Sequence, residues 1–225
     1  MFKPFGENQA EYVRSIAENP ITICTGPAGS GKTSVVAAMA AQYLEEGKVE
    51  KIIVSRPTVE AGKGLGFLPG DMSAKIGPYM VPILEELRKH MGDILFDKYF
   101  EQKIIEVLPL EFGRGRNFHN SFIILDEAAN STFAQMKMFI SRIGKKSKLV
   151  INGDPDQTDL KFWEAGALEF IIEAFENDKN VGIVQLKDCD IVRNKIIGPL
   201  MRKMTNEAFQ DFQQKRRDKN KVEQG

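Results

Sequence analysis

Short runs of apolar, often β-branched residues recur along the chain with few polar residues inside them. Strands that are buried on both faces have this pattern, whereas a strand with one solvated face alternates apolar and polar residues. Six such runs predict buried strands at residues 21–25, 51–55, 103–107, 121–126, 148–152 and 182–186.

Helical patterns lie between most of these runs, and they predict helices at residues 32–46, 79–91, 133–143 and 162–175. Strands that alternate with helices are typical of an α/β fold, in which helices cover both faces of a mostly parallel sheet. We therefore expect that architecture here. A phosphate-binding loop requires the same setting, with a buried strand before it and a helix after it.

The pattern also suggests how the chain is divided into a domain and a tail. The glycines and Pro69 of AGKGLGFLPGD indicate an ordered loop rather than a linker, and residues after Asp190 have a helical pattern. The last residues, QQKRRDKNKVEQG, are charged. We expect one domain over residues 1–201 and a helical or disordered charged tail over 202–225; a basic arm that binds nucleic acid is the alternative for this tail.

Composition excludes some classes of protein without identifying a function. The 31 Lys and Arg residues balance 31 Asp and Glu residues, so net charge favours neither nucleic acid nor a membrane. No apolar run approaches the roughly 20 residues needed to cross a bilayer. The two cysteines, Cys24 and Cys189, and the two histidines lack metal-ligand spacing, so we expect a reduced, intracellular protein with no membrane contact.

A glycine-rich segment, GPAGSGKT, joins the first predicted strand to the first predicted helix. It matches GxxxxGK[ST], a loop whose backbone N–H groups surround a β-phosphate at the N-terminus of a helix. Lys32 would bridge the β- and γ-phosphates, and the Thr33 hydroxyl would ligate Mg²⁺. The alternative is a glycine turn with a surface lysine. The nucleotide-binding residues predicted here are Gly26, Pro27, Ala28, Gly29, Ser30, Gly31, Lys32, Thr33 and Ser34.

Two carboxylates follow another predicted strand, in SFIILDEAAN. Asp126 is predicted to ligate Mg²⁺, and Glu127 is predicted to polarise the attacking water. An adjacent acidic residue of this kind is typical of hydrolysing ATPases rather than of kinases, which need a site for a hydroxyl acceptor. The alternative interpretation is that both carboxylates cap a following helix.

A third segment, NGDPDQTDL, follows the strand predicted at 148–152, and it would direct Asp154 and Gln157 toward the same phosphates. The order of P-loop, DE pair and GDxxQ resembles the N-terminal core of superfamily 1 helicases. The resemblance implies that Gln157 senses the γ-phosphate and that Gln9, in GENQAEY, recognises the adenine edge. An amide pairs with adenine N6 and N7, so the implied nucleotide is ATP.

Six blocks extend the resemblance from Gln9 to about Met201: SRPTVEAGKGLGFLPGD, GPYMVPILEEL, PLEFGRGRNF, FIILDEAANSTFAQMKMFISRIG, NGDPDQTDL and DIVRN. In this order they resemble the PhoH-like family of phosphate-starvation-inducible ATPases. The family implies a RecA-like P-loop NTPase core that is cytoplasmic, related to helicases and often associated with RNA metabolism.

The chain departs from the family pattern at two positions. Ala129 occupies a position where the family usually has glutamine, and Asn194 follows Arg193 where the family usually has histidine. Neither change removes a Mg²⁺ or phosphate ligand, but both affect the expected coupling of hydrolysis to a nucleic-acid strand.

Helicases of superfamily 1 bind ATP between two RecA-like domains, and 225 residues hold one such domain. We therefore expect a ring-like homo-oligomer, for example a hexamer, in which a neighbouring subunit supplies an arginine to the γ-phosphate. Arg142 and Arg193 are the candidates, and a surface ion pair is the alternative for each.

A local patch is the candidate for contact with single-stranded RNA or DNA, because it lies in loops that follow predicted strands and contains two aromatic residues. Its members are Arg56, Lys63, Arg114, Arg116, Phe67 and Phe112. Alternatively, Arg56 and Arg116 bind the nucleotide phosphates or pair with Glu60. A nucleotide-dependent switch or assembly factor for protein partners is the second functional class, and a kinase is the third.

Overall fold

The computed structural model describes residues 2–57, 72–161, 163–191, 203 and 206–223. The chain separates into two units, Met1–Ile191 and Val192–Gly225. The second unit contains helix α8 (Asn206–Glu223). The predicted boundary at residue 201 and the loop AGKGLGFLPGD lie outside the described residues. None of the described helices has both the length and the apolar character that crossing a bilayer requires.

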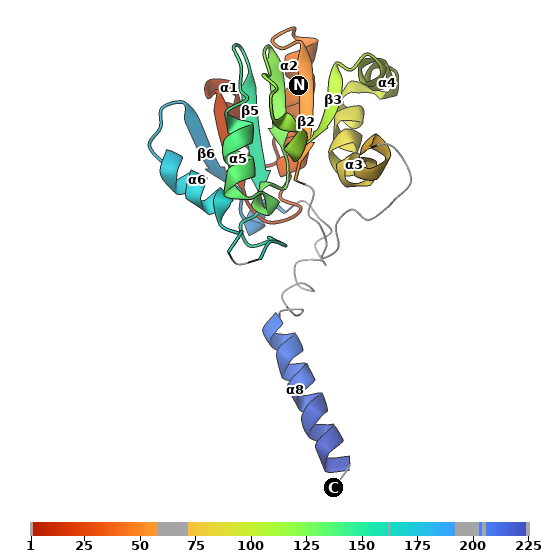
Figure 1. Ribbon diagram of the computed structural model, residues 1–225, viewed down its shortest axis with the longest axis vertical. Helices are drawn as coiled ribbons and strands as arrows, with labels where there is room; N and C mark the ends of the chain where they lie inside the picture. The colour runs from red at the N-terminus through yellow and green to blue at the C-terminus, as the bar shows by residue number, and fades with distance from the viewer. Residues whose placement is uncertain (1, 58–71, 162, 192–202, 204–205, 224–225) are drawn as a thin grey trace. The chain divides into compact units, whose positions relative to one another are not determined.

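The first unit is built on a parallel sheet of six strands in the order β3-β2-β4-β5-β1-β6 (Figure 1). This sheet confirms the predicted α/β class. Because all strands point the same way, the loops that follow them gather at one edge of the sheet. The strands are β1 (Ile21–Thr25), β2 (Lys51–Arg56), β3 (Ile105–Pro109), β4 (Ser121–Leu125), β5 (Lys148–Gly153) and β6 (Val181–Gln185).

Helices cover both faces of the sheet, as the alternating pattern predicts. Helices α1 (Glu7–Glu18), α2 (Lys32–Glu45), α3 (Met72–Met91) and α4 (Asp93–Glu101) bury side chains in one apolar cluster. Helices α5 (Phe133–Ile140) and α6 (Ala167–Phe175) belong to a second cluster. Within β2, Ile52 and Val54 face the first cluster and Ile53 faces the second, as the two-residue period of a strand requires.

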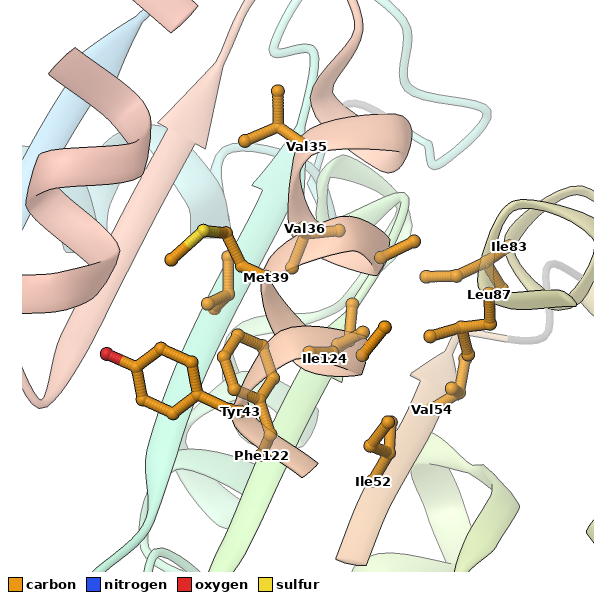
Figure 2. Packing of buried hydrophobic residues seen from close by; sticks show 14 of the residues in the cluster. Val35, Val36, Met39, Tyr43, Ile52, Val54, Ile83, Leu87, Phe122 and Ile124 are labelled. Atoms are coloured by element: carbon orange, nitrogen blue, oxygen red, sulfur yellow. The ribbon is translucent and has the colours of Figure 1, made fainter. Parts of the chain in front are cut away.

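Helix α2 is buried on most of its sides, because the sheet, α1 and α3 all pack against it. Figure 2 shows Met39 and Tyr43 of α2 near Phe122 of β4, with Leu87 of α3 near Val54 of β2. Each such side chain contributes about 1.5–3 kcal/mol when fully buried. This packing fixes the helix that carries the phosphate loop at its N-terminus.

Local backbone geometry explains where the elements differ from the sequence pattern. Strand β3 begins two residues later than predicted, after Lys103 in the left-handed region (φ 55°). Helix α6 begins at Ala167 rather than 162, since its N-cap Gly166 has φ 88°. Helix α5 ends at Ile140, α3 extends back to Met72, and α1 and α4 are additional helices. Within the described ranges, three 3₁₀ turns connect elements: η1 (Leu110–Gly113), η2 (Ala128–Asn130) and η3 (Asp188–Asp190).

Candidate nucleotide-binding site

The three motifs follow three neighbouring strands. The P-loop follows β1, the GDPDQ segment spans the end of β5, and the acidic pair follows β4. Strand β5 pairs with both of the others, with Thr25 opposite Gly153 and Leu125 opposite Ile151. The sheet therefore places the phosphate loop, the Asp154 segment and the two carboxylates side by side at its carboxyl edge.

The P-loop backbone has the conformation that its glycines permit. Gly26 and Gly31 have positive φ angles of 143° and 95°. A Cβ atom on Gly26 would lie 2.5 Å from the Leu186 carbonyl oxygen, so a larger residue does not fit without movement. Gly31 is the N-cap of α2, and the helix N-terminus is thus directed at the loop, where an anion is stabilised.

The Lys32 side chain lies across the P-loop. Its Nζ donates to the carbonyl oxygen of Gly26 and, over 3.1 Å, to that of Pro27. The Ser30 hydroxyl donates to the same Pro27 oxygen over 2.8 Å. Lys32 is therefore held at the loop whose predicted ligand is a phosphate chain, where its ammonium group can exchange carbonyl oxygens for phosphate oxygens.

Gln9 is buried beside this loop. Its Nε2 donates to Ser30 O over 2.9 Å, and its Oε1 accepts from the Phe5 N–H over 3.0 Å. A Cβ atom on Gly31 would lie 2.5 Å from Nε2. The structure thus gives Gln9 a role in supporting the P-loop, while recognition of adenine by Gln9 stays a prediction.

Asp126 is a buried carboxyl group at the end of β4, with 4% of its surface exposed. Burial raises its pKa to about 6, and the neighbouring Glu127 also raises it, whereas Arg56, Lys32 and the Asn152 amide lower it. Its backbone N–H donates to Ser55 O over 2.9 Å. An incompletely compensated buried carboxylate is a group that a bound cation would stabilise.

These residues fit the prediction of a Mg²⁺ site. Mg²⁺ is commonly bound by one or two carboxylates, water and the phosphates of a substrate. Within the described ranges, no three His, Cys, Asp or Glu side chains gather as a preformed metal site. Asp126 and Thr33, in the first turn of α2, would therefore act together with nucleotide oxygens.

Glu127 has an unusual backbone for a residue with a side chain. Its φ and ψ angles are 54° and 40°, in the left-handed region. Non-glycine residues in this region are uncommon and are concentrated at functional sites. The Oε1 atom lies 3.4 Å from Nη2 of Arg56. The Glu127 backbone is thus constrained, and its carboxylate has a charged partner.

The segment after β5 connects the P-loop with the acidic pair. Asp154 lines a cavity of about 610 Å³ together with Thr25, Gly26 and Pro27. Gln157 is exposed, and its Nε2 donates to Asp154 Oδ2 over 2.6 Å. The structure brings Asp154 to the P-loop and places Gln157 against Asp154.

The same segment also contacts the turn after the acidic pair. Thr158 Oγ1 donates to the carbonyl oxygen of Ala129 over 3.0 Å. The backbone N–H of Asp159 donates to Asn130 Oδ1 over 2.8 Å. Ala129 is buried, so its methyl group occupies a packed position where the family usually has an amide. These contacts join the residues that follow GDPDQ to η2.

The two arginine candidates remain predictions. Arg142 donates to Met138 O over 3.2 Å and to Ser141 Oγ, all near the end of α5. Since α5 runs back from the end of β4 toward the start of β5, Arg142 lies at the amino edge of the sheet, away from the P-loop of its own chain. Arg193 lies outside the described residues.

The predicted nucleic-acid patch is only partly described. Arg116 forms a two-point ion pair with Glu106, in which Nη2 lies 3.0 Å from Oε2, and its guanidinium lies over the Phe118 ring. Arg114 and Phe112 are exposed. Arg56 contacts Glu127, and Lys63, Phe67 and Glu60 lie outside the described ranges.

Two residues to which the sequence analysis assigned no role support the site. The Tyr12 hydroxyl donates to Asn152 Oδ1 over 2.5 Å, and both side chains are fully buried. Asn152 also lies next to Asp126 and lowers its pKa. A polar residue in a buried strand directly before Gly-Asp was a signal for Asn152, whereas Tyr12 has no such signal.

The chain is similar to known proteins in sequence and in fold. The family model described as PhoH-like protein matches residues 1–205. The chain is 41% identical to a PhoH-like protein of Mycobacterium tuberculosis over 199 residues, 88% of this chain and 56% of the relative. It is 39% identical to a PhoH-like protein of Bacillus subtilis over 193 residues, 86% of this chain and 60% of the relative. The chain thus spans just over half of these relatives.

A solved structure shares the fold. The large terminase of a thermophilic bacteriophage matches with a TM-score of 0.60 at 12% identity, covering 91% of this chain and 51% of the terminase. At this identity the likeness concerns the fold alone, a parallel sheet with helices on both faces.

Proposed function

Since the chain belongs to the PhoH-like protein family, we propose that it is a Mg²⁺-dependent ATPase whose hydrolysis is coupled to single-stranded RNA or DNA. The order of the strands carries this proposal. Strand β5 lies between β1 and β4, so Asp154 stands between the phosphate loop and the acidic pair. Chemistry at a γ-phosphate requires these groups within reach of one another.

In the proposed mechanism, the P-loop N–H groups and Lys32 bind and orient the phosphate chain. Thr33 and Asp126 would hold Mg²⁺, which neutralises charge on the phosphate oxygens when it is bound. Glu127 orients a water molecule for attack on the γ-phosphorus and accepts a proton from it. Asp154 and its hydrogen-bonded partner Gln157 respond to the presence of the γ-phosphate.

A nucleotide-dependent switch or assembly factor for protein partners is a second candidate. Two observations favour it. Within the described part of the predicted patch, Arg56 and Arg116 are both engaged by carboxylates of this chain. A patch whose cations are already paired offers less charge to a phosphate backbone. Ala129, which occupies a position where the family usually has glutamine, also favours the switch.

We further propose that the protein is cytoplasmic and acts as a ring-like homo-oligomer such as a hexamer. A RecA-like domain presents its P-loop at an open edge, and an arginine from a second subunit can complete the site. Arg142 and Arg193 are the candidates for this arginine. Light scattering with and without ATP would measure the subunit number, and replacing the true arginine should stop turnover without loss of ATP binding.

The decisive experiment is phosphate release with Mg²⁺ and ATP by the wild-type chain and by Lys32→Ala. We expect the substitution to remove turnover, whereas Lys145→Ala, at a lysine outside the site, should not. Equal release by wild type and Lys32→Ala would refute the ATPase. Single-stranded RNA and DNA are then added separately. Stimulation of phosphate release by either polymer supports the coupled ATPase. The switch is supported if the subunit number changes with nucleotide while neither polymer affects phosphate release.

A further inference from the structure

Arg56 joins the acidic pair to a helix on the same side of the sheet. It is the last residue of β2, and its Nη2 lies 3.4 Å from Glu127 Oε1. Its other terminal nitrogen, Nη1, donates to the Tyr79 carbonyl oxygen of α3 over 2.7 Å. One guanidinium therefore bridges Glu127 and α3.

The pairing of β2 with β4 brings Arg56 close to Glu127. Strands β2 and β4 are neighbours, with Ser55 opposite Leu125, and the Asp126 N–H donates to Ser55 O over 2.9 Å. On the far side, the Asn130 N–H donates to the Glu127 carbonyl oxygen over 3.1 Å. The Glu127 backbone is thus held on both sides at φ 54°, and Arg56 is an ionic partner of its side chain.

The pair contributes little to stability by itself, because both side chains are partly exposed, Arg56 at 22% and Glu127 at 40%. The direction in which the Glu127 carboxylate points matters more than the strength of the ion pair. A carboxylate that orients an attacking water must point at one place, and a small displacement of such a group can lower a rate up to about 100-fold. The planar fork of arginine can make both contacts at once, whereas the single ammonium of lysine cannot reproduce that geometry.

We infer that Arg56 is a positioning residue for Glu127, which it holds toward the γ-phosphate side of the site through its second contact with α3. This inference rests on the proposed ATPase function. It assigns Arg56 a place in the nucleotide site instead of the nucleic-acid patch.

The test measures kcat, KM and ATP affinity for Arg56→Ala and Arg56→Lys. We expect Arg56→Ala to lower kcat about tenfold or more, with the Kd for a non-hydrolysable ATP analogue unchanged. Arg56→Lys should recover part of the loss, because it restores the charge but not the fork. Arg88→Ala is the matched control: this arginine of α3 pairs with Asp97 and Asp93, away from the site, and turnover should stay at the wild-type level.

A second measurement separates positioning from a merely structural role. In a Glu127→Gln background, Arg56→Ala should cause no further loss of turnover, because the group that it positions is already gone. A loss as large as in the wild-type background would overturn the inference. So would a loss confined to ATP affinity or to RNA affinity, since Arg56 would then bind a ligand directly. If wild type and Lys32→Ala release phosphate equally, the proposed function itself fails.

Discussion

The Gln9 side chain ties the N-terminal segment to the P-loop, with Nε2 donating to the Ser30 carbonyl oxygen over 2.9 Å. Its Oε1 accepts from the Phe5 N–H, and only 2% of the residue is exposed. A second anchor lies nearby, where Asn8 Nδ2 donates to Asp190 Oδ2 over 2.8 Å. The phosphate loop is therefore supported from outside the motif that defines it.

We predict that Gln9→Ala lowers the free energy of unfolding by about 1–3 kcal/mol, because the buried Ser30 carbonyl oxygen and the part-buried Phe5 N–H lose their partner. Urea denaturation without nucleotide measures this. Gln42→Ala, at a more exposed amide that bonds Glu46, should change stability by much less. An unchanged midpoint for Gln9→Ala would contradict the support role.

The same variant tests whether Gln9 recognises adenine. Loss of support alone should weaken binding of ATP and GTP equally, because both share the phosphate chain. Loss of an adenine contact should weaken ATP binding and leave GTP binding nearly unchanged. Titration with each nucleotide distinguishes the two roles.

We predict that Glu127→Gln lowers turnover about 100-fold or more and keeps ATP binding, because an amide cannot accept the proton of the attacking water. Steady-state phosphate release and binding of a fluorescent ATP analogue measure the two effects. Glu173→Gln, on the exposed side of α6, is the control. Retention of more than half of the wild-type rate by Glu127→Gln would exclude Glu127 as the base.

The raised pKa of Asp126 predicts a pH-dependent stability. Its carboxyl group titrates near 6 in the folded state, against an ordinary value of 3.8. At pH 7 the charge is buried at a cost of about 2–3 kcal/mol. Between pH 6 and pH 4 the folded protein binds the proton first, so stability is gained as the pH falls and the cost disappears.

Asp126→Asn should therefore stabilise the protein at pH 7, in EDTA and without nucleotide, while it removes Mg²⁺-dependent turnover. The gain should shrink as the pH falls from 6 toward 4. Thermal unfolding of wild type and variant side by side over this range measures the difference. A gain that does not change with pH would mean that Asp126 is not the titrating group.

We predict that Gly153→Ala destabilises the protein by about 1–3 kcal/mol, as expected for overpacking. A Cβ atom there would lie 2.5 Å from Leu168 Cδ2 and 3.1 Å from Ala129 N. Gly6→Ala is the control, since its added carbon meets only Asp190 Oδ1 at 3.5 Å. Chemical denaturation measures both, and a Gly153→Ala variant as stable as Gly6→Ala would show that α6 adjusts freely.

The sequence predicted the strands well, because buried parallel strands leave continuous apolar runs. It also predicted that GPAGSGKT and Asp126 directly follow buried strands, as they do in the structure, whereas their roles at a nucleotide stay predictions. It missed α1 and α4, since their amphipathic patterns are short. It could not anticipate the Tyr12–Asn152 bond or the pairing of Arg56 with Glu127, because both join residues far apart in the chain that only the strand order brings together.

The enclosure of α2 limits how this protein can respond to a nucleotide. A helix packed against the sheet, α1 and α3 cannot tilt or slide without disturbing close-packed side chains. Helix α2 and the P-loop at its N-terminus therefore stay in place. In the proposed hydrolysis cycle, we therefore expect movement to begin outside α2, at the exposed Gln157 and the partly exposed Arg56–Glu127 pair.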